Sequence, residues 1–363
     1  MANNKTRFTS FQFAIMIMFP ILSLFSGIGT YNVIRIAKID SWMSPLFGGI
    51  LGIIVLLMFM YIFNYLPDKN IVDKNKVLFG NVLGTIINYI VCGLFIMIGV
   101  VLIYNVSNFA VSQFLAETPL LVFMILLGIV LIYNVYSGIE NISRVGIIFF
   151  VIIIILTIIS TFGVLPTIEL SNIKPMLEYG IEKPILGGLF LFVSNIVPIF
   201  SLLIVEKDML IDKKKTSKYL NIFYILGIIF IFMSIFLTIS SLGIHLSLEY
   251  QYPEYTVLKK ISLLNFIDRI ENFIYIKWIL SSLMFLSIII YYVSKSISNK
   301  SKKLVPTLVL GIIIFISLYL FKNNTIFYNF TSTIFPYICL MLLIVFIVIS
   351  INIFIRKILG VEN

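Results

Sequence analysis

The chain has 363 residues, of which 60% are hydrophobic and 12% are charged, with a formal net charge of +10. Ordinary globular proteins carry roughly 25% charged residues, and the mean hydropathy of this chain is +1.11. Its charges are gathered into short clusters between apolar runs that are long enough to cross a bilayer. The composition therefore excludes a soluble enzyme and indicates one integral membrane domain over residues 1–363.

Ten apolar runs have the length of a transmembrane helix, which needs about 20 mostly apolar residues to satisfy its own backbone in lipid. The first run is expected to be a retained helix and not a signal peptide, because it lacks a small-residue cleavage site. The third run is expected to end at Tyr104, where a polar cluster begins. The expected helices are Phe11–Ile34, Pro45–Tyr65, Asn81–Tyr104, Pro119–Ser137, Val145–Phe162, Pro184–Val205, Tyr219–Leu242, Phe273–Val293, Leu304–Phe321 and Ile334–Ile355.

The distribution of basic residues predicts that both termini are cytoplasmic. With that orientation 17 of the 26 Lys and Arg residues lie on the inner side, where cytoplasmic loops normally hold an excess of them. The largest inner cluster runs from Lys207 to Lys218, and a lipid-headgroup or partner site is the alternative interpretation of it. The positive net charge is thus explained by the lipid bilayer as a partner, and no nucleic acid is expected.

Two stretches outside these runs have patterns of their own. From Tyr255 to Ile274 apolar residues recur at helical spacing with charged residues between them. We expect an amphipathic helix there, lying on the outer membrane surface. The segment Leu165–Lys183 contains Pro166 and Pro175 and is expected to be an extended outer loop.

Irregular sequence inside two of the runs predicts broken helices. The first run contains Ser26-Gly27-Ile28-Gly29-Thr30, and the sixth contains Ser194-Asn195-Ile196-Val197-Pro198. Glycine lets a ligand approach the backbone closely, whereas proline removes a backbone donor and frees a carbonyl about one turn earlier. Unwound backbone at membrane depth is tolerated only where it faces protein or a water-filled cavity.

The two irregular segments lie in corresponding helices, five apart. Two successive units of five helices must insert with opposite orientations, so the chain is expected to be an inverted repeat, residues 1–163 followed by residues 184–355. Paired broken helices in the two halves of such a repeat point to a binding site near the bilayer midplane. The alternative is that glycine and proline serve only ordinary helix packing.

Several short motifs resemble a known family, the spore germination receptor B subunits, also called endospore germination permeases. These proteins belong to the amino acid, polyamine and organocation transporter superfamily, so the resemblance implies an all-α leucine-transporter-like fold of ten helices. The motifs are Ser26-Gly27-Ile28-Gly29-Thr30, Phe114-Leu115-Ala116-Glu117-Thr118-Pro119, Gly138-Ile139-Glu140 with Arg144, Tyr252-Pro253-Glu254 and Phe266-Ile267-Asp268-Arg269-Ile270-Glu271.

The resemblance also implies a function and a site. A protein of this family would recognise a small nutrient germinant, typically an amino acid, in the inner membrane of a spore. Its partners would be an A subunit and a lipoprotein C subunit. The expected ligand-binding residues are Gly27, Gly29, Thr30, Ser194 and Asn195 at the two breaks, with Tyr104, Ser287 and Tyr291 from the third and eighth helices. For Ser287 and Tyr291 an interhelical hydrogen bond or an interfacial tyrosine is an equally good interpretation.

No Asp, Glu, Lys or Arg lies near the middle of any run, so the expected ligand is held by backbone groups, hydroxyls and amides. A zwitterionic amino acid suits such a site, with its carboxylate on the amide groups after the first break and its ammonium near the sixth helix. The charged residues Glu117, Glu140, Arg144 and Lys277 lie at helix ends, where snorkelling or loop salt bridges explain them. This pattern favours a sensor or passive conduit over a driven pump, although sodium coupling through carbonyls and hydroxyls stays open.

Other chemistry is sparse. His245 is the single histidine, and Cys92 and Cys339 fall inside expected helices, so no catalytic residue, metal site or cofactor is expected. Three classes of function are considered: a germinant receptor subunit, an amino acid permease, and a membrane enzyme or lipid-handling protein. The third is weakest, because acidic, His and Cys residues are not gathered at one interface. The family motifs favour the receptor over the permease.

Overall fold

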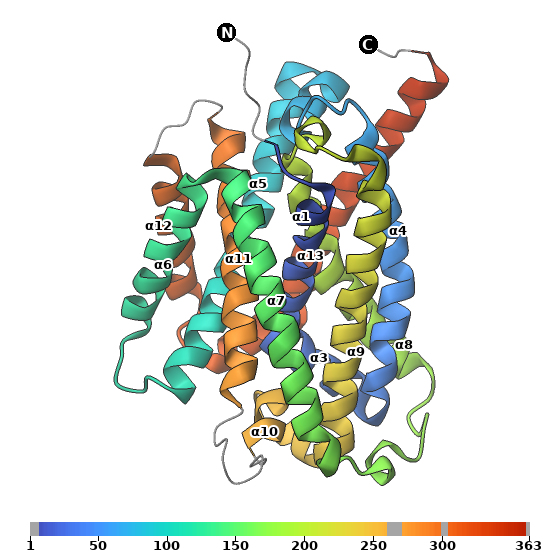
Figure 1. Cartoon of the computed structure of the whole chain (residues 1–363), viewed down its shortest axis with the longest axis vertical. Coiled ribbons are helices and arrows are strands. Elements are labelled where there is room, and N and C mark those ends of the chain that lie inside the picture. Colours follow the sequence, from blue (N-terminus) through green and yellow to red (C-terminus); the bar gives the residue numbers. More distant parts are fainter. Residues whose placement is uncertain (1–6, 260–270, 299–303, 361–363) are drawn as a thin grey trace.

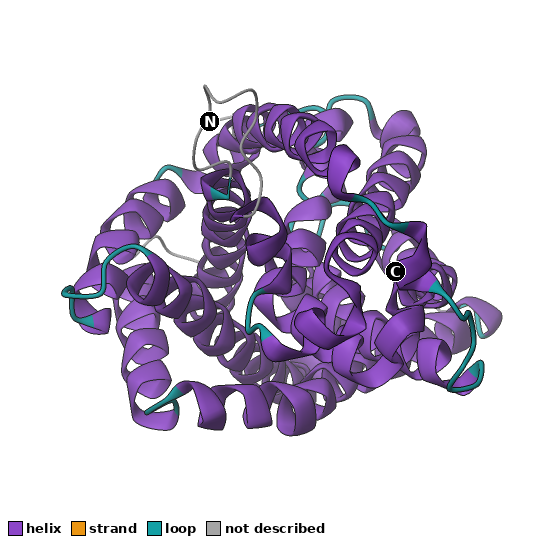
Figure 2. Ribbon diagram, turned by 90° about the horizontal axis from the view of Figure 1, so that it is seen from below, coloured by secondary structure: helices purple, strands orange, loops and turns teal. Residues whose placement is uncertain are grey.

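The computed structural model describes residues 7–259, 271–298 and 304–360. Figure 2 shows these residues as helices and loops, and none of them forms a strand. Seven continuous helical stretches among them are long and apolar enough to span a membrane, and the first, Ser10–Asn64, contains two of the expected passes. The shorter apolar helices Leu120–Tyr136 and Leu304–Leu320 complete the set. The prediction of an all-helical membrane fold of ten passes is confirmed.

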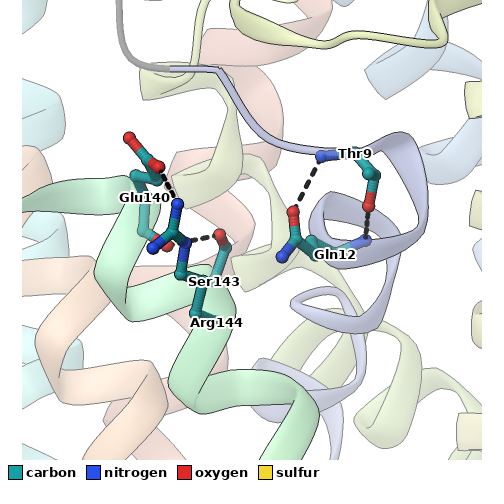
Figure 3. A network of polar contacts seen from close by, with 5 residues as sticks. All are labelled: Thr9, Gln12, Glu140, Ser143 and Arg144. Atoms are coloured by element: carbon teal, nitrogen blue, oxygen red, sulfur yellow. Dashed lines mark hydrogen bonds and ion pairs between the residues drawn. The ribbon is translucent and has the colours of Figure 1, made fainter.

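The first pass is assembled from several short pieces. They are α1 (Ser10–Ile15), α2 (Met18–Leu24), the π-helical turn η1 (Phe25–Gly29) and α3 (Thr30–Ala37). Its start is fixed by a capping box, in which the Gln12 backbone N–H donates to the Thr9 hydroxyl and the Thr9 N–H donates to the Gln12 side chain (Figure 3). Two otherwise unpaired donors at the helix N-terminus are satisfied in this way.

The other nine passes follow the expected order, with boundaries shifted by a few residues in most cases. The sixth pass combines α8 with a π-helical turn, η5, and a 3-10 segment, η6. The helices are α4 (Ser44–Asn64), α5 (Ile71–Gln113), α6 (Leu120–Tyr136), α7 (Gly138–Val164), α8 (Glu182–Leu191), η5 (Phe192–Ile196), η6 (Val197–Ile204), α9 (Thr216–Glu249), α11 (Asn272–Ile297), α12 (Leu304–Leu320) and α13 (Asn324–Ile358).

The third pass is longer than expected, because α5 continues to Gln113 and does not end at Tyr104. Two of the polar residues beyond Tyr104 donate hydrogen bonds to other parts of the protein. The Asn105 side chain donates to the Ser26 carbonyl at 2.9 Å, and the Asn108 side chain donates to the Tyr252 hydroxyl at 3.1 Å. Polar side chains that find partners in the protein need no water, so the helix continues through them.

The start of α1 and the end of α13 lie at the same end of the molecule, at the top of Figure 1. The basic segment from Lys207 to Lys218 lies there too, because it is hydrogen-bonded to the chain at the start of α1. The Phe8 N–H donates to the Met209 carbonyl at 3.2 Å, and the Ser10 N–H donates to the Asp212 carboxylate at 2.7 Å. This arrangement agrees with the predicted topology, in which both chain ends and this basic loop share one side.

The loop after α7 lies at the opposite end of the molecule and includes two short 3-10 turns, Leu165–Thr167 and Leu170–Ile173. It is tied to other outer segments by its backbone. The Glu169 N–H donates to the Ser240 carbonyl at 3.0 Å, and the Leu177 N–H donates to the Asp40 carboxylate at 2.9 Å. The expected outer loop is therefore present, but it is packed onto its neighbours.

The amphipathic helix expected over residues 255–274 is described only at its two ends, since residues 260–270 lie outside the described residues. Its first part is the helix α10 (Pro253–Lys259), which begins two residues earlier than expected. The expectation that this part lies on the membrane surface is wrong. Glu254, Tyr255, Val257 and Leu258 are all buried, so α10 packs against the ends of the neighbouring helices, chiefly α9, at the outer end of the molecule (Figure 1).

Small residues bring α4 and α8 into direct backbone contact. A Cβ atom added at Gly188 would lie 2.9 Å from the Gly48 nitrogen and 2.7 Å from the Phe47 Cβ. A Cβ added at Gly48 would lie 2.7 Å from the Gly188 carbonyl oxygen. Such close approach is how small residues hold helices together in membranes, where lipid supplies no hydrophobic force between them.

This contact predicts that Gly188→Val lowers the thermal stability of the purified protein, because the added methyl groups must push two backbones apart. Overpacking of this kind costs about 1–3 kcal/mol. Gly93→Val is the matched control, since Gly93 is also in a helix and has no atom within 4 Å of an added Cβ. The measurement is the temperature at which each variant in detergent loses its monodisperse chromatographic peak. Equal temperatures for both variants would contradict the proposed packing.

Candidate functional site

The break in the first pass lies at Ser26 and Gly27. Ser26 has an extended ψ of 124°, and Gly27 has a φ of 75°, which L-residues with a side chain rarely adopt. The site also leaves no room for a side chain, because a Cβ at Gly27 would lie 2.6 Å from the Trp278 ring. The freed Ser26 carbonyl accepts the hydrogen bond from Asn105. Helix 1 is therefore broken as predicted, and glycine is required at the break.

The sixth pass is distorted but not unwound. It changes from an α-helix to the π-helical turn η5 and then to the 3-10 segment η6, which has Pro198 in its first turn. The expectation of a second fully broken helix is therefore too strong, because the widened turn absorbs the effect of the proline without leaving helical geometry. The two irregular segments nevertheless meet: a Cβ added at Gly29 would lie 3.1 Å from the Asn195 side-chain nitrogen.

Buried polar atoms without partners gather around this meeting point. Neither side-chain polar atom of Asn195 has a hydrogen-bond partner among the described residues, and the same holds for the Ser194 hydroxyl. The Asn105 Oδ1 atom, which would lie 3.0 Å from a Cβ at Gly27, is also unpaired within the described part of the chain, and so is the Nε1 atom of Trp278, whose ring carbons contact the same glycine. Because roughly 90% or more of buried polar groups in proteins are hydrogen-bonded, this cluster of unpaired atoms is suited to hold water or a polar ligand.

Glu254, on α10, contributes a carboxylate to the break, although its helix lies outside the ten passes. Its Oε1 atom accepts the Gly27 backbone N–H at 3.0 Å, and the residue is 5% exposed. Burial raises the pKa of the Glu254 carboxyl, while the hydrogen bond from Gly27 acts in the opposite direction. The other carboxylate oxygen, Oε2, has no hydrogen-bond partner among the described residues.

This carboxylate corrects the expectation that a ligand in the break meets no charged side chain. Glu254 lies outside the ten apolar runs, directly before the stretch that the sequence predicts to be a helix on the outer surface. A signal was present, because Glu254 begins a short segment whose other residues are mostly apolar, which is unusual for an exposed helix. In this structure Glu254 also occupies the Gly27 amide, where the carboxylate of an amino acid ligand was expected.

A cavity adjoins the break on the side formed by α7, α9, α10 and α11. Its volume is about 110 Å³, counted as the space open to the centre of a water-sized sphere. Glu254 and Lys277 both line it, and the Lys277 ammonium lies 3.5 Å from the Ser160 hydroxyl. Lys277 is half-buried and reaches the cavity from the first turns of α11, and its interpretation as a snorkelling or loop-paired lysine stays a prediction.

Three of the predicted binding residues contact other elements. The Tyr104 ring packs against Phe327, with ring centroids 4.8 Å apart. Ser287 accepts a hydrogen bond from the Asn134 side chain at 2.9 Å, which is the interhelical bond considered as its alternative interpretation. Tyr291 lines a separate cavity beside the start of α7. Their role in binding stays a prediction, whereas Thr30, whose hydroxyl donates to the Phe25 carbonyl at 3.3 Å, lies at the break itself.

The remaining polar residues singled out in the sequence have structural surroundings. Arg144 forms an ion pair with Glu140 one turn earlier in α7, as Figure 3 shows, which agrees with the salt bridge expected there. Cys92 and Cys339 are buried free cysteines. Within the described ranges, no group of three or more His, Cys, Asp or Glu residues could hold a metal ion.

Comparisons with known proteins agree with this architecture. The spore germination protein family matches residues 7–326. Two proteins of Bacillus subtilis (strain 168) are similar over 258 residues, with 69% of this chain and 68% of each relative covered. Spore germination protein A2 is 21% identical, and spore germination protein KB is 23% identical.

A solved structure of a Na⁺-coupled sialic acid symporter, in its substrate-bound outward-open state, has a similar fold. The TM-score is 0.62 at 12% sequence identity, with 93% of this chain and 79% of the symporter covered. At this identity the likeness concerns the fold alone. The family match over nearly the whole chain, the broken first helix and the transporter-like fold lead to one conclusion: this chain belongs to the spore germination protein family and is a membrane protein of the germinant receptor or permease type.

Proposed function

We propose that this chain is the membrane-embedded B subunit of a spore germination receptor and that it recognises a small amino acid. Its relatives are named as spore germination proteins, which supports a role in germination and a place in the inner membrane of the spore. The further partners in this proposal are an A subunit and a lipoprotein C subunit. Binding of the amino acid changes the arrangement of the subunits and starts germination.

One observation carries the proposal: the glycine-lined break in the first helix meets the distorted turn of the sixth, and buried polar atoms are unpaired there. A site that holds a small polar molecule needs such convergent donors and acceptors inside an otherwise apolar protein. The Asn195 amide faces Gly29, and Glu254 is bonded to Gly27. A ligand at this place contacts both halves of the fold, so its binding can change their relative position.

A permease that moves an amino acid by alternating access is the second candidate. The observation that favours it is the fold, which is shared with a symporter. Fold alone does not decide function, so the two candidates need different experiments. Uptake of labelled amino acid by the purified chain in liposomes would support the permease.

The receptor proposal predicts that spores lacking this gene lose the response to at least one nutrient. Spores of the deletion strain and of a complemented strain are exposed to a panel of amino acids and other nutrients, and germination is followed as the fall in optical density. We expect a selective loss that complementation restores. A normal response to every nutrient, in a strain without other receptors, would contradict the proposal.

A second prediction concerns the break itself. Gly27→Ala should abolish the response or raise the required nutrient concentration at least tenfold, because the new Cβ collides with Trp278 and strains a positive-φ residue. Gly180→Ala is the matched control: Gly180 has a φ of +80° but an added Cβ there has no atom closer than 3.6 Å. Both variants are compared at equal protein levels in spores. An unchanged dose response for Gly27→Ala would show that the break is not part of the site.

A further inference from the structure

The cavity beside the break contains one acidic and one basic side chain. Among the described residues that line it, Glu254 and Lys277 are the charged ones. They come from different elements, α10 and α11, and neither forms an ion pair with another side chain among the described residues. Each has a neutral hydrogen-bond partner, Gly27 or Ser160, but opposite charges without an ion-pair partner are costly away from water. A ligand carrying both charges would satisfy them.

From this arrangement we infer that the cavity is the binding site for a zwitterionic amino acid, with its ammonium on Glu254 and its carboxylate on Lys277. The inference rests on the proposed function and deepens it: it places the ligand in the cavity that adjoins the break beside Ser26 and Glu254, and it gives the ligand's polarity and size. It reverses the polarity expected from the sequence, in which the ligand carboxylate was placed on the amide groups of the first helix.

The occupied amide of Gly27 explains the reversal. Its N–H is already donated to Glu254 Oε1 at 3.0 Å, so a ligand carboxylate does not find a free donor there. The Oε2 atom of the same carboxylate is unpaired within the described residues and accepts an ammonium group without breaking the bond to Gly27. Glu254 thereby connects the ligand to the break in the first helix, which is the element most able to change shape.

The hydroxyl groups around the cavity have a matching polarity. Thr157 donates its proton to the Ile153 carbonyl at 2.7 Å, and Ser281 donates to the Trp278 carbonyl at 2.9 Å. Thr238 does the same with the Ser234 carbonyl at 2.7 Å. Because each hydroxyl hydrogen is already donated to a carbonyl, the oxygen can only accept a further hydrogen bond from a ligand, so an ammonium is favoured near them. Lys277 then supplies the cationic group that a carboxylate requires.

The size and remaining lining limit the side chain of the ligand. The cavity of about 110 Å³ has room for several water molecules, since a single water needs roughly 10–15 Å³ of such space. Phe230, Met233 and Leu237 from α9 and Val164 from α7 form an apolar part of the wall. The site therefore suits an amino acid with a small apolar side chain, such as alanine or valine.

The test measures binding of tritiated L-alanine and L-valine to the full chain in lipid nanodiscs. Glu254→Gln and Lys277→Met should each weaken binding of the better ligand at least tenfold, because a hydrogen bond to a charged group is lost in a buried site. Glu254→Gln keeps an acceptor for the Gly27 N–H, so the break itself is preserved. The controls are Glu249→Gln and Lys259→Met, exposed residues of the same outer region, which should bind as the unchanged chain does.

Two analogues separate direct contact from a general loss of folding. L-Alanine methyl ester keeps the ammonium without the carboxylate, and N-acetyl-L-alanine keeps the carboxylate without the ammonium. Lys277→Met should weaken the binding of alanine but leave competition by the methyl ester unchanged. Glu254→Gln should leave competition by the acetylated compound unchanged. A misfolded variant would bind alanine and both analogues more weakly by the same factor. That result for both variants would overturn the inference.

The outcomes also separate this inference from the proposed function. If the unchanged chain binds alanine or valine and both site variants bind them within twofold of it, the cavity is not the site, while amino acid recognition stands. If the unchanged chain binds neither amino acid, the inferred ligand class is overturned. In that second case the deletion strain decides the proposed function independently, because it tests germination and not binding.

Discussion

The hydrogen bond from the Gly27 amide to Glu254 is the interaction on which the rest of the site depends. A broken helix inside a membrane exposes backbone groups that lipid cannot satisfy. Here the Asn105 side chain pairs the Ser26 carbonyl, and the Glu254 carboxylate pairs the next amide. The break is thus held open by two side chains from outside its own helix, and α10 must be buried because it carries one of them.

This constraint explains why the fold was easier to predict than the site. Apolar length alone sets the ten passes, since each helix satisfies its own backbone whatever its neighbours are. The glycines at 27 and 29 marked the break correctly, because positive φ and close approach are local requirements. Contacts that join distant segments left no comparable pattern: Glu254 is 227 residues from its partner Gly27, and nothing in the spacing of either residue pairs them.

Polar residues were misjudged for a related reason. The sequence predicts a helix end at Tyr104, where Asn105 and Asn108 belong to a polar cluster, and it predicts that Lys277 snorkels or pairs in a loop. The reason is that a polar side chain near a span end normally reaches water. In the structure the two asparagine side chains pair with Ser26 and Tyr252, and the half-buried Lys277 lies 3.5 Å from the Ser160 hydroxyl. Orientation around a helix axis depends on which neighbours it packs against, and a single sequence of uniformly apolar helices does not encode those neighbours visibly.

The position of Glu254 also links recognition to movement. The carboxylate is carried by a short helix, α10, that lies at the end of the molecule opposite the start of α1 and the end of α13 (Figure 1) and lines the cavity. In the complex inferred above, an ammonium on one oxygen would alter the hydrogen bond that the other makes to Gly27, and with it the geometry of the broken helix. A receptor and a permease both use such a coupling, and they differ in whether the ligand is then released on the far side. The same residues therefore serve either function, and what separates the two is the path beyond the cavity.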